Sequence, residues 1–224
     1  MKVKLISYTS PSPDLLEDGI DSIVSLISFC ARVSNPSSQY NTETSERLIS
    51  YLMKHKHWSP FEMVNVCLEI ETTRDIARQL LRHRSFSFQE FSQRYADPVK
   101  ELSFVTREAR VQDVKNRQNS IELDPSVSES VELSVQWKMK QEELIEHAKD
   151  VYHWAIQNGI AKEQARCVLP EGNTVSRMYV NGTIRSWIHY IELRSENGTQ
   201  KEHSEIARQC AVVISKVCSL FDME

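Results

Sequence analysis

The sequence predicts a single mixed α/β (α+β) domain, rich in helix, that spans residues 1–224. The chain is long enough for one well-buried core and rather short for two. Hydrophobic residues make up 40% of it and charged residues 26%, values typical of a globular protein. Segments with strand-like alternation are interleaved with segments of helical spacing. The chain has only 5 glycines, which disfavours a sandwich with many tight hairpins.

The first half of the chain is predicted to contain two strands and three helices. Residues 2–6 alternate in strand fashion, and residues 63–72 alternate apolar and polar positions with β-branched side chains, as in a half-buried strand. Apolar residues recur with helical spacing in 23–31, 42–54 and 74–81. The third helix therefore follows directly on the second strand.

The second half is predicted to start with an irregular segment and to end in helices. Residues 97–131 are polar and charged, which favours a loop-rich insertion or lid. Residues 132–157 form a long helical pattern that ends at Asn158-Gly159, and in it large residues recur at heptad-like intervals: Trp137, Leu144, His147, Val151 and Trp154. The remaining elements are a short helix at 161–167, a strand at 174–180, and helices at 185–193 and 202–220.

Charge and hydropathy narrow the class of protein. The formal charge of −4 disfavours a protein that binds nucleic acid by neutralising phosphates across a whole face. No apolar run approaches the roughly 18 to 20 residues that a membrane helix needs. The start of the chain is typical of a strand and a turn rather than of a signal peptide, so the expected location is the cytosol.

Cysteine and glycine spacing exclude several kinds of site. The 5 cysteines are scattered and form no CxxC pair, so we expect neither a disulfide framework nor a metal site, and we expect reduced, mostly buried thiols. Cys167 invites a nucleophile interpretation, but no surrounding residue activates it, which favours a buried apolar cysteine. No two glycines lie close enough for GxGxxG or a P-loop. Any dinucleotide must therefore bind without those turns.

The segment 82–95, RHRSFSFQEFSQRY, concentrates groups that recognise nucleotides. Arg74, Arg78 and Arg82 share one helix face, which alone would suggest a solvated surface. The segment that follows combines arginines, hydroxyls, carboxamides and aromatic rings, which suit a phosphate and a planar heterocycle. Two hypotheses remain open from these residues: a mononucleotide site, or a single-stranded RNA-binding module with a basic aromatic platform.

The same segment resembles the signature of the flavin-dependent thymidylate synthases, an RHR triplet followed by seven residues and a serine. In its fuller form, RHRxxSxNxxSxR, the matching residues are Arg82, His83, Arg84, Ser87, Ser92 and Arg94, with Gln89 in place of the usual asparagine. Further elements of that family are similar to ARVS at 31–34, HWSPFE at 57–62, Ala77 to Gln79, ARCVLP at 165–170 and the segment 185–194.

The resemblance implies a fold, an assembly and a reaction. The fold would be a central mixed sheet with flanking helices, in a homotetramer whose active sites lie at subunit interfaces. The reaction would be the reductive methylation of dUMP to dTMP, with FAD as cofactor and with NADPH and 5,10-methylenetetrahydrofolate as co-substrates. No nucleic acid or membrane partner is implied. A flavoprotein that has lost synthase activity is a further alternative.

The resemblance also implies roles for particular residues. Arg194 would be catalytic, favouring the N3-ionised form of the uracil ring, and a permanently charged donor suits that task. The residues implied to bind dUMP are Gln79, Arg82, Glu90, Phe91, Ser92, Gln93, Arg94, Arg166 and Arg194. Those implied to bind FAD are Ser59, Arg82, His83, Arg84, Glu90, Arg185 and His189, and His57 and Glu62 are candidates for folate contact or flavin stacking.

Plainer interpretations and two departures from the family stay open. Arg166 and Arg194 are also what a helix C-terminus attracts, and His57 could simply end a helix. Thr183 stands where the family has an asparagine, and Asn181 is a possible substitute. The partner of the family's downstream flavin histidine is either Lys201 or His203.

Overall fold

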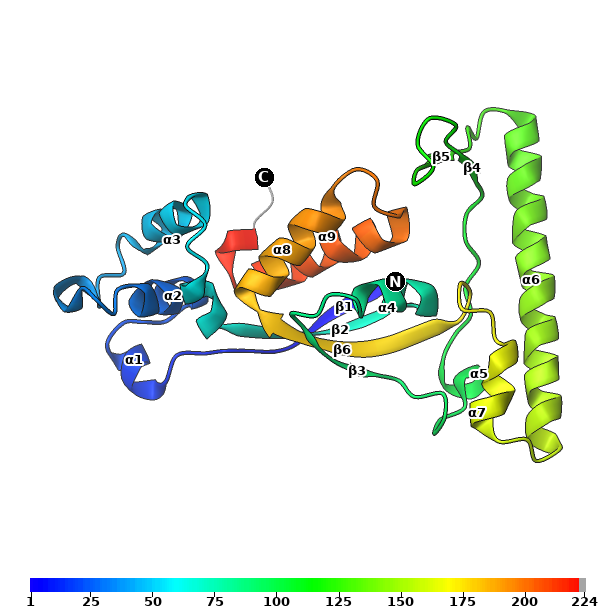
Figure 1. Ribbon diagram of the computed structural model, residues 1–224, viewed down its shortest axis with the longest axis horizontal. Helices are drawn as coiled ribbons and strands as arrows, with labels where there is room; N and C mark the ends of the chain where they lie inside the picture. Colours follow the sequence, from blue (N-terminus) through cyan, green and yellow to red (C-terminus); the bar gives the residue numbers. More distant parts are fainter. Residues whose placement is uncertain (222–224) are drawn as a thin grey trace.

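The computed structural model describes residues 1–221, which are built around one four-stranded sheet (Figure 1). The strands are β1 (Lys2–Tyr8), β2 (Asn65–Thr73), β6 (Val175–Thr183) and β3 (Ser87–Glu90), in the order β1-β2-β6-β3. All three neighbouring pairs are antiparallel. The expected α/β fold is confirmed, but the expectation of a mixed sheet is wrong. No strand here returns in parallel through a crossover helix.

Two helices start at opposite ends of the central strand pair. Asn65 of β2 lies opposite Thr183 of β6, and Thr73 lies opposite Val175. Helix α4 (Arg74–Leu80) follows β2 directly, and α8 (Ile184–Ser195) follows β6 directly. Because the strands are antiparallel, the two helices begin at opposite ends of the pair and each turns back over the sheet. This topology brings the end of α4 toward the end of α8.

The core lies on one face of the sheet. Alternate residues of β6 are buried and the rest are exposed, which is the pattern of a sheet covered on one side. The covering helices include α4, α8 and α9 (Lys201–Ser215), whereas α2 (Ile23–Ala31) lies beyond one end of the sheet (Figure 1). Trp187 is completely buried in this layer and donates its indole N–H to the carbonyl of Val66 at 3.0 Å. The opposite face of β6 exposes Tyr179.

Further helices lie beyond both ends of the sheet (Figure 1). One end carries α1 (Pro13–Glu17), η1 (Pro36–Ser38), α3 (Ser45–Lys54) and η2 (Ser59–Met63). The other carries α5 (Pro98–Glu101), α6 (Ser128–Gln157), α7 (Lys162–Ala165) and η3 (Arg166–Val168), and η4 (Ser219–Phe221) follows α9. The predicted helices and strands are found to within a few residues. Within residues 1–221, none of the helices is long and apolar enough to cross a membrane.

The segment 97–131 has more structure than its composition predicts. It contains α5 and a hairpin of β4 (Arg110–Gln112) and β5 (Ser120–Glu122), and α6 begins within it at Ser128. The hairpin is tied to α9 by an ion pair between Arg110 and Glu202 and by Lys201, which reaches Glu122 at 2.5 Å. Because ion pairs to a distant helix hold the hairpin, local sequence patterns do not reveal it.

Helix α6 does not bury the residues that repeat at heptad-like intervals. Trp137, Leu144 and Trp154 are exposed. The buried positions are Gln141, Ile145, Ala148, Tyr152 and Ala155. The helix therefore contacts the rest of the chain along a different face and leaves Trp137, Leu144 and Trp154 uncovered. Likewise, Cys210 and Cys218 are buried as expected, but Cys167 is exposed and the expectation that it is buried is wrong.

We predict that Gly182→Ala destabilises the fold. A Cβ at this position of β6 would come within 3.0 Å of two ring carbons of Phe86. That ring is packed against Trp187, with centroids 4.5 Å apart, and cannot move away freely. Overpacking of this kind costs about 1–3 kcal/mol. Chemical denaturation at fixed protein concentration should show this loss, whereas Gly172→Ala should resemble the wild type because nothing lies within 4 Å of its Cβ. Equal stability of the two variants would contradict the prediction.

Candidate active site

The end of α4 and the end of α8 meet at a hydrogen bond between two predicted site residues. Arg194 donates its Nε–H to Nε2 of His83 at 2.9 Å. A guanidinium can only donate, so Nε2 of His83 must accept and its ring proton lies on Nδ1. The two residues are 111 positions apart in sequence. The antiparallel placement of β2 and β6 brings them together.

Two histidines beside Arg194 are held in the neutral form. Burial, followed by the charge of Arg194, lowers the pKa of His83 to about 4. Burial, followed by the charge of Arg194, lowers the pKa of His203 to about 3. Within residues 1–221, no carboxylate forms an ion pair with Arg194. Arg194 is therefore a half-buried cation whose neighbours do not neutralise it.

The neutral rings predict that the fold loses stability in acid. Both histidines would take up protons near pH 6.5 in the unfolded chain, but only near 4 and 3 in the folded chain. As the pH falls below 6.5, the unfolded state binds more protons, and the free energy of unfolding decreases. One such group contributes at most about 1.4 kcal/mol per pH unit.

Denaturant unfolding between pH 7 and pH 4, at fixed protein concentration, measures this slope. His203→Asn removes one of the two rings and should give a shallower dependence on pH than the wild type. If the two proteins lose stability in parallel over this range, His203 is not held neutral in the fold.

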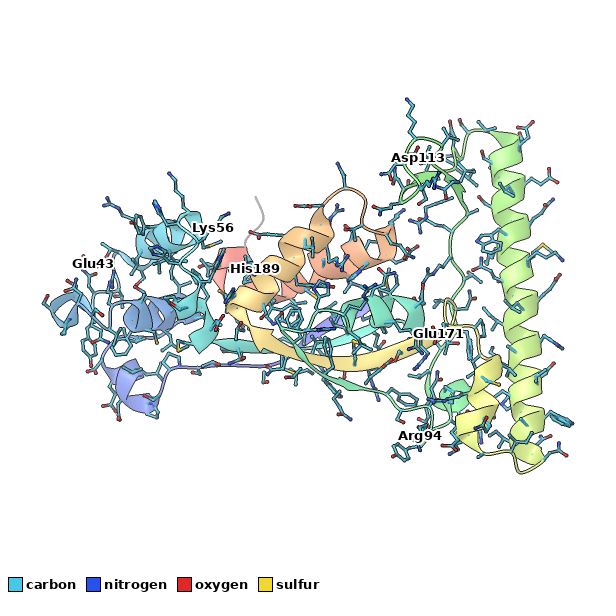
Figure 2. The ribbon with its side chains drawn as sticks, in the orientation of Figure 1. Glu43, Lys56, Arg94, Asp113, Glu171 and His189 are labelled. Atoms are coloured by element: carbon cyan, nitrogen blue, oxygen red, sulfur yellow. The ribbon has the colours of Figure 1, made fainter. Side chains whose placement is uncertain are left out.

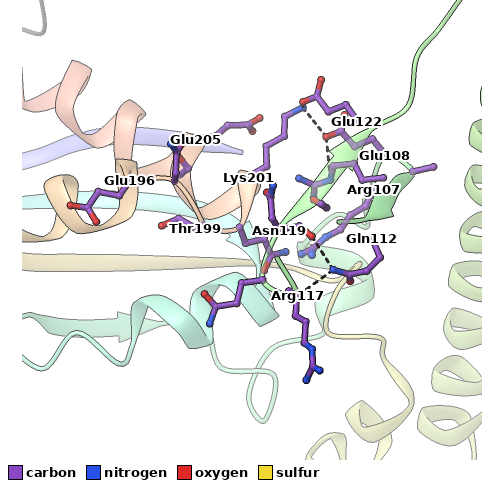
Figure 3. Close-up of a pocket in the computed structure, with 18 of the residues that line it drawn as sticks. Arg107, Glu108, Gln112, Arg117, Asn119, Glu122, Glu196, Thr199, Lys201 and Glu205 are labelled. Atoms are coloured by element: carbon purple, nitrogen blue, oxygen red, sulfur yellow. Dashed lines mark hydrogen bonds and ion pairs between the residues drawn. The ribbon is translucent and has the colours of Figure 1, made fainter. Parts of the chain in front are cut away.

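Gln79 on α4 lies in the same group as Arg194, through contacts with the start of α9. Its Nε2 donates to Oε1 of Gln200 at 2.8 Å, and its Oε1 lies 3.1 Å from Nδ1 of His203. His203 is completely buried. Lys201 instead lies toward the surface, with ion pairs to Glu108 and Glu122 (Figure 3). Of the two open alternatives, His203 is the residue placed beside the predicted site.

The arginines that flank His83 are exposed and available. Within residues 1–221, the side chains of Arg82 and Arg84 have neither a hydrogen bond nor an ion pair, whereas most other arginines here are paired. Two unpaired guanidinium groups on either side of a neutral histidine suit a phosphate or diphosphate ligand. The donor set therefore fits the diphosphate of a dinucleotide such as FAD.

A second group of predicted residues gathers where η2 meets the first turns of α8. Arg185 forms an ion pair with Glu62, and the ring of His189 meets that of Trp58 edge-on at 4.6 Å between centroids. Ser59 opens η2 beside them. His57 is exposed and lies near His55, with ring centroids 6.2 Å apart. All the residues predicted to contact folate or flavin outside the segment 82–95 belong to this group.

A third group surrounds β3 and α7. Glu90 accepts from Ser176 at 2.7 Å and lies 3.4 Å from Arg74. Arg94 forms an ion pair with the carboxylate of Glu163 at 3.2 Å, and Arg166 donates its Nε–H to the backbone carbonyl of Glu163 at 3.3 Å. The other members are Phe91, Ser92 and Gln93. The backbone N–H of Phe91 donates to the carbonyl of Arg177, and Gln93 is buried with its Nε2 unpaired.

The three groups lie apart from one another along the described part of the chain. Figure 2 shows Arg94 beside α7 and His189 near the start of α8, toward the other end of the sheet. Along α8 itself, nine residues separate Arg185 from Arg194, a rise of about 14 Å. The residues predicted to bind dUMP and FAD therefore line a long stretch of the molecular surface.

A cavity of about 880 Å³ adjoins this surface between the hairpin and the α8–α9 connection (Figure 3). Its lining includes Arg107, Ser195 and Gln200, and Lys201 reaches from α9 to the hairpin there. None of the residues predicted to bind dUMP or FAD lines it. The cavity is therefore a neighbour of the predicted site and not the site itself.

Thr183 has a structural role at the start of α8. Its hydroxyl accepts the backbone N–H of Ser186 at 3.2 Å, as an N-cap does. Asparagine also caps helices well, so threonine preserves this function at the position where the family has asparagine. Asn181 lies exposed on β6. Sequence reasoning missed Gln200, whose signal would have been its place two residues before the predicted helix at 202–220.

Comparisons with known proteins agree with the motif. Residues 16–218 match the family model described as thymidylate synthase complementing protein, Thy1. A probable flavin-dependent thymidylate synthase of Paramecium bursaria Chlorella virus 1 is 46% identical over 216 residues, covering 96% of this chain and 94% of that one. The flavin-dependent thymidylate synthase of a Synechocystis species is 45% identical over 218 residues, covering 96% and 95%.

A solved structure has the same fold. It is the crystal structure of the UMP/dUMP methylase PolB from Streptomyces cacaoi bound with 5-Br dUMP. It superposes with a TM-score of 0.78 at 24% identity, covering 98% of this chain and 92% of that chain.

Proposed function

This chain belongs to the Thy1 family of flavin-dependent thymidylate synthases, and from that premise we propose that the group around Arg194 is its catalytic centre. The activity is the reductive methylation of dUMP to dTMP, and the cofactor is FAD. When bound, FAD supplies the hydride that completes the new methyl group. The methylene carbon comes from 5,10-methylenetetrahydrofolate, and NADPH supplies the electrons.

The observation that carries the assignment is the unneutralised charge of Arg194. Its Nε–H is engaged by His83, which fixes the guanidinium plane, and the terminal N–H groups remain available. A fixed cation beside the uracil ring stabilises negative charge on that ring, and a partly dry site strengthens the interaction. His83 serves here as a neutral acceptor, since a protonated ring would repel Arg194.

The remaining predicted residues bind and orient the ligands. Arg82 and Arg84 would hold phosphates of FAD, and the ring of His189 and the ion pair of Glu62 with Arg185 would position its ring system or the folate. The third group, which is the segment from Glu90 to Arg94 with Arg166, would hold dUMP.

We further propose that complete sites form between chains of a homotetramer. One supporting observation is the distance along the molecule between the groups that must share ligands (Figure 2). A second is the apolar surface left uncovered on α6, where Trp137 and Trp154 are exposed. Exposed apolar patches of this kind mark protein interfaces.

The first test is a visible absorption spectrum of the purified protein with FAD, followed by NADPH in the presence of dUMP. Bound flavin should bleach, and added 5,10-methylenetetrahydrofolate should then yield dTMP. Bleaching without dTMP would identify a flavoprotein that has lost synthase activity. A protein that ignores FAD and instead binds RNA oligomers with steep salt dependence would support the RNA-binding alternative.

A further inference from the structure

The side-chain amide of Gln79 is held on both sides by the first turn of α9. Its Nε2 donates to Gln200 at 2.8 Å, and its Oε1 lies 3.1 Å from Nδ1 of His203. Each amide atom keeps one unused bonding position: a second N–H on Nε2 and a second lone pair on Oε1. With both contacts made at once, the amide presents its oxygen to His203 and its nitrogen to Gln200.

His203 can make this contact in one tautomer only. Since Oε1 of Gln79 is an acceptor, Nδ1 of His203 must carry the proton. Burial and the nearby charge of Arg194 keep the ring neutral, so Nε2 is left without a proton. Nε2 is buried and has no partner within residues 1–221. Isolated histidine prefers its proton on the other nitrogen, so the contact with Gln79 holds the ring in a less common state.

The backbone of α9 supports both contacts. The N–H groups of His203 and Ser204 donate to the carbonyl of Gln200, at 2.9 and 3.0 Å. Gln200 and His203 are therefore one rigid unit at the helix start.

We propose that His203 is a positioning residue for substrate recognition: with Gln200 it fixes the amide of Gln79 so that one N–H and one carbonyl lone pair face the pyrimidine edge of dUMP. Before the ring is ionised at N3, the uracil edge offers a carbonyl acceptor beside the N3–H donor, which is the complementary pattern. The inference rests on the proposed function, in which Gln79 contacts dUMP.

The test compares dUMP binding to FAD-loaded wild-type and variant protein by calorimetry, with kcat and KM measured in parallel. His203→Leu removes the N–H and should weaken dUMP binding about 10-fold, with KM rising more than kcat falls. His203→Asn places an amide N–H near the position of Nδ1 and should restore binding to within about 3-fold. The FAD content should be unchanged in both variants, and a loss of FAD in both would indicate a general structural role and overturn the proposal.

A double-variant cycle shows whether His203 acts through Gln79. Gln79→Ala alone should bind dUMP as weakly as Gln79→Ala combined with His203→Leu. Additive losses would overturn the proposal, because His203 would then act by another route.

Nitrogen NMR of histidine-labelled protein gives a readout that does not depend on activity. The proposal expects the His203 proton on Nδ1, and a proton on Nε2 would overturn it. Failure of the proposed function would look different. The wild type would then bind dUMP in the pattern described and yet form no dTMP.

Discussion

Arg194→Ala is expected to reduce turnover by about 100- to 1000-fold while the protein keeps most of its FAD. The variant loses the unneutralised cation beside the predicted uracil position, and the loss of one preorganised donor of developing negative charge typically has an effect of this size. The loss of the hydrogen bond to His83 is a smaller term, because His83 still packs edge-on against Tyr190 with centroids 5.0 Å apart. Single-turnover dTMP formation and flavin absorbance, measured on the same samples, separate the two effects.

Two comparison variants define the interpretation. Arg82→Ala should lower both turnover and FAD retention, because Arg82 is unpaired and is proposed to hold a phosphate of FAD. Arg47→Ala removes an exposed arginine of α3, at the far end of the sheet, and should leave both unchanged. Turnover in Arg194→Ala equal to that of the wild type would eliminate Arg194 as the catalytic arginine.

Trp187→Ala is expected to lower the free energy of unfolding by about 3–5 kcal/mol. The indole is completely buried and packs against Phe86, and its N–H bonds the carbonyl of Val66. The alanine variant leaves a large cavity and loses the hydrogen bond to the carbonyl of Val66. Phe86 lies two residues after the RHR triplet, so this variant should also lose FAD. Chemical denaturation followed by circular dichroism, at fixed protein concentration, measures the change.

Trp187→Phe separates packing from hydrogen bonding. It keeps most of the apolar volume and should cost about 0.5–1.5 kcal/mol for the lost hydrogen bond, with FAD retained. Val114→Ala, at a side chain that is 93% exposed, should match the wild type. A small change in Trp187→Ala would show that the layer between the sheet and α8 does not control the stability of this fold.

Sequence alone was informative where short-range patterns decide the outcome. Alternation predicts β2 and β6, and helical spacing predicts α4, α8 and α9, because each pattern reflects which side of an element meets the core. The RHR segment is likewise continuous in sequence, so its residues and the family they resemble were legible without coordinates. The guanidinium groups of Arg82 and Arg84 indicate phosphate binding from the residue types alone.

The tertiary structure decided what depends on residues far apart in the chain. The antiparallel pairing of β2 with β6 places His83 against Arg194, and no local pattern contains that contact. The hairpin within 97–131 is held by ion pairs from α9, which its own polar sequence does not reveal. The sequence alone therefore predicts a loop there. Burial places His203 against Gln79 and Lys201 toward the surface, because only the folded core determines which of these two side chains faces inward.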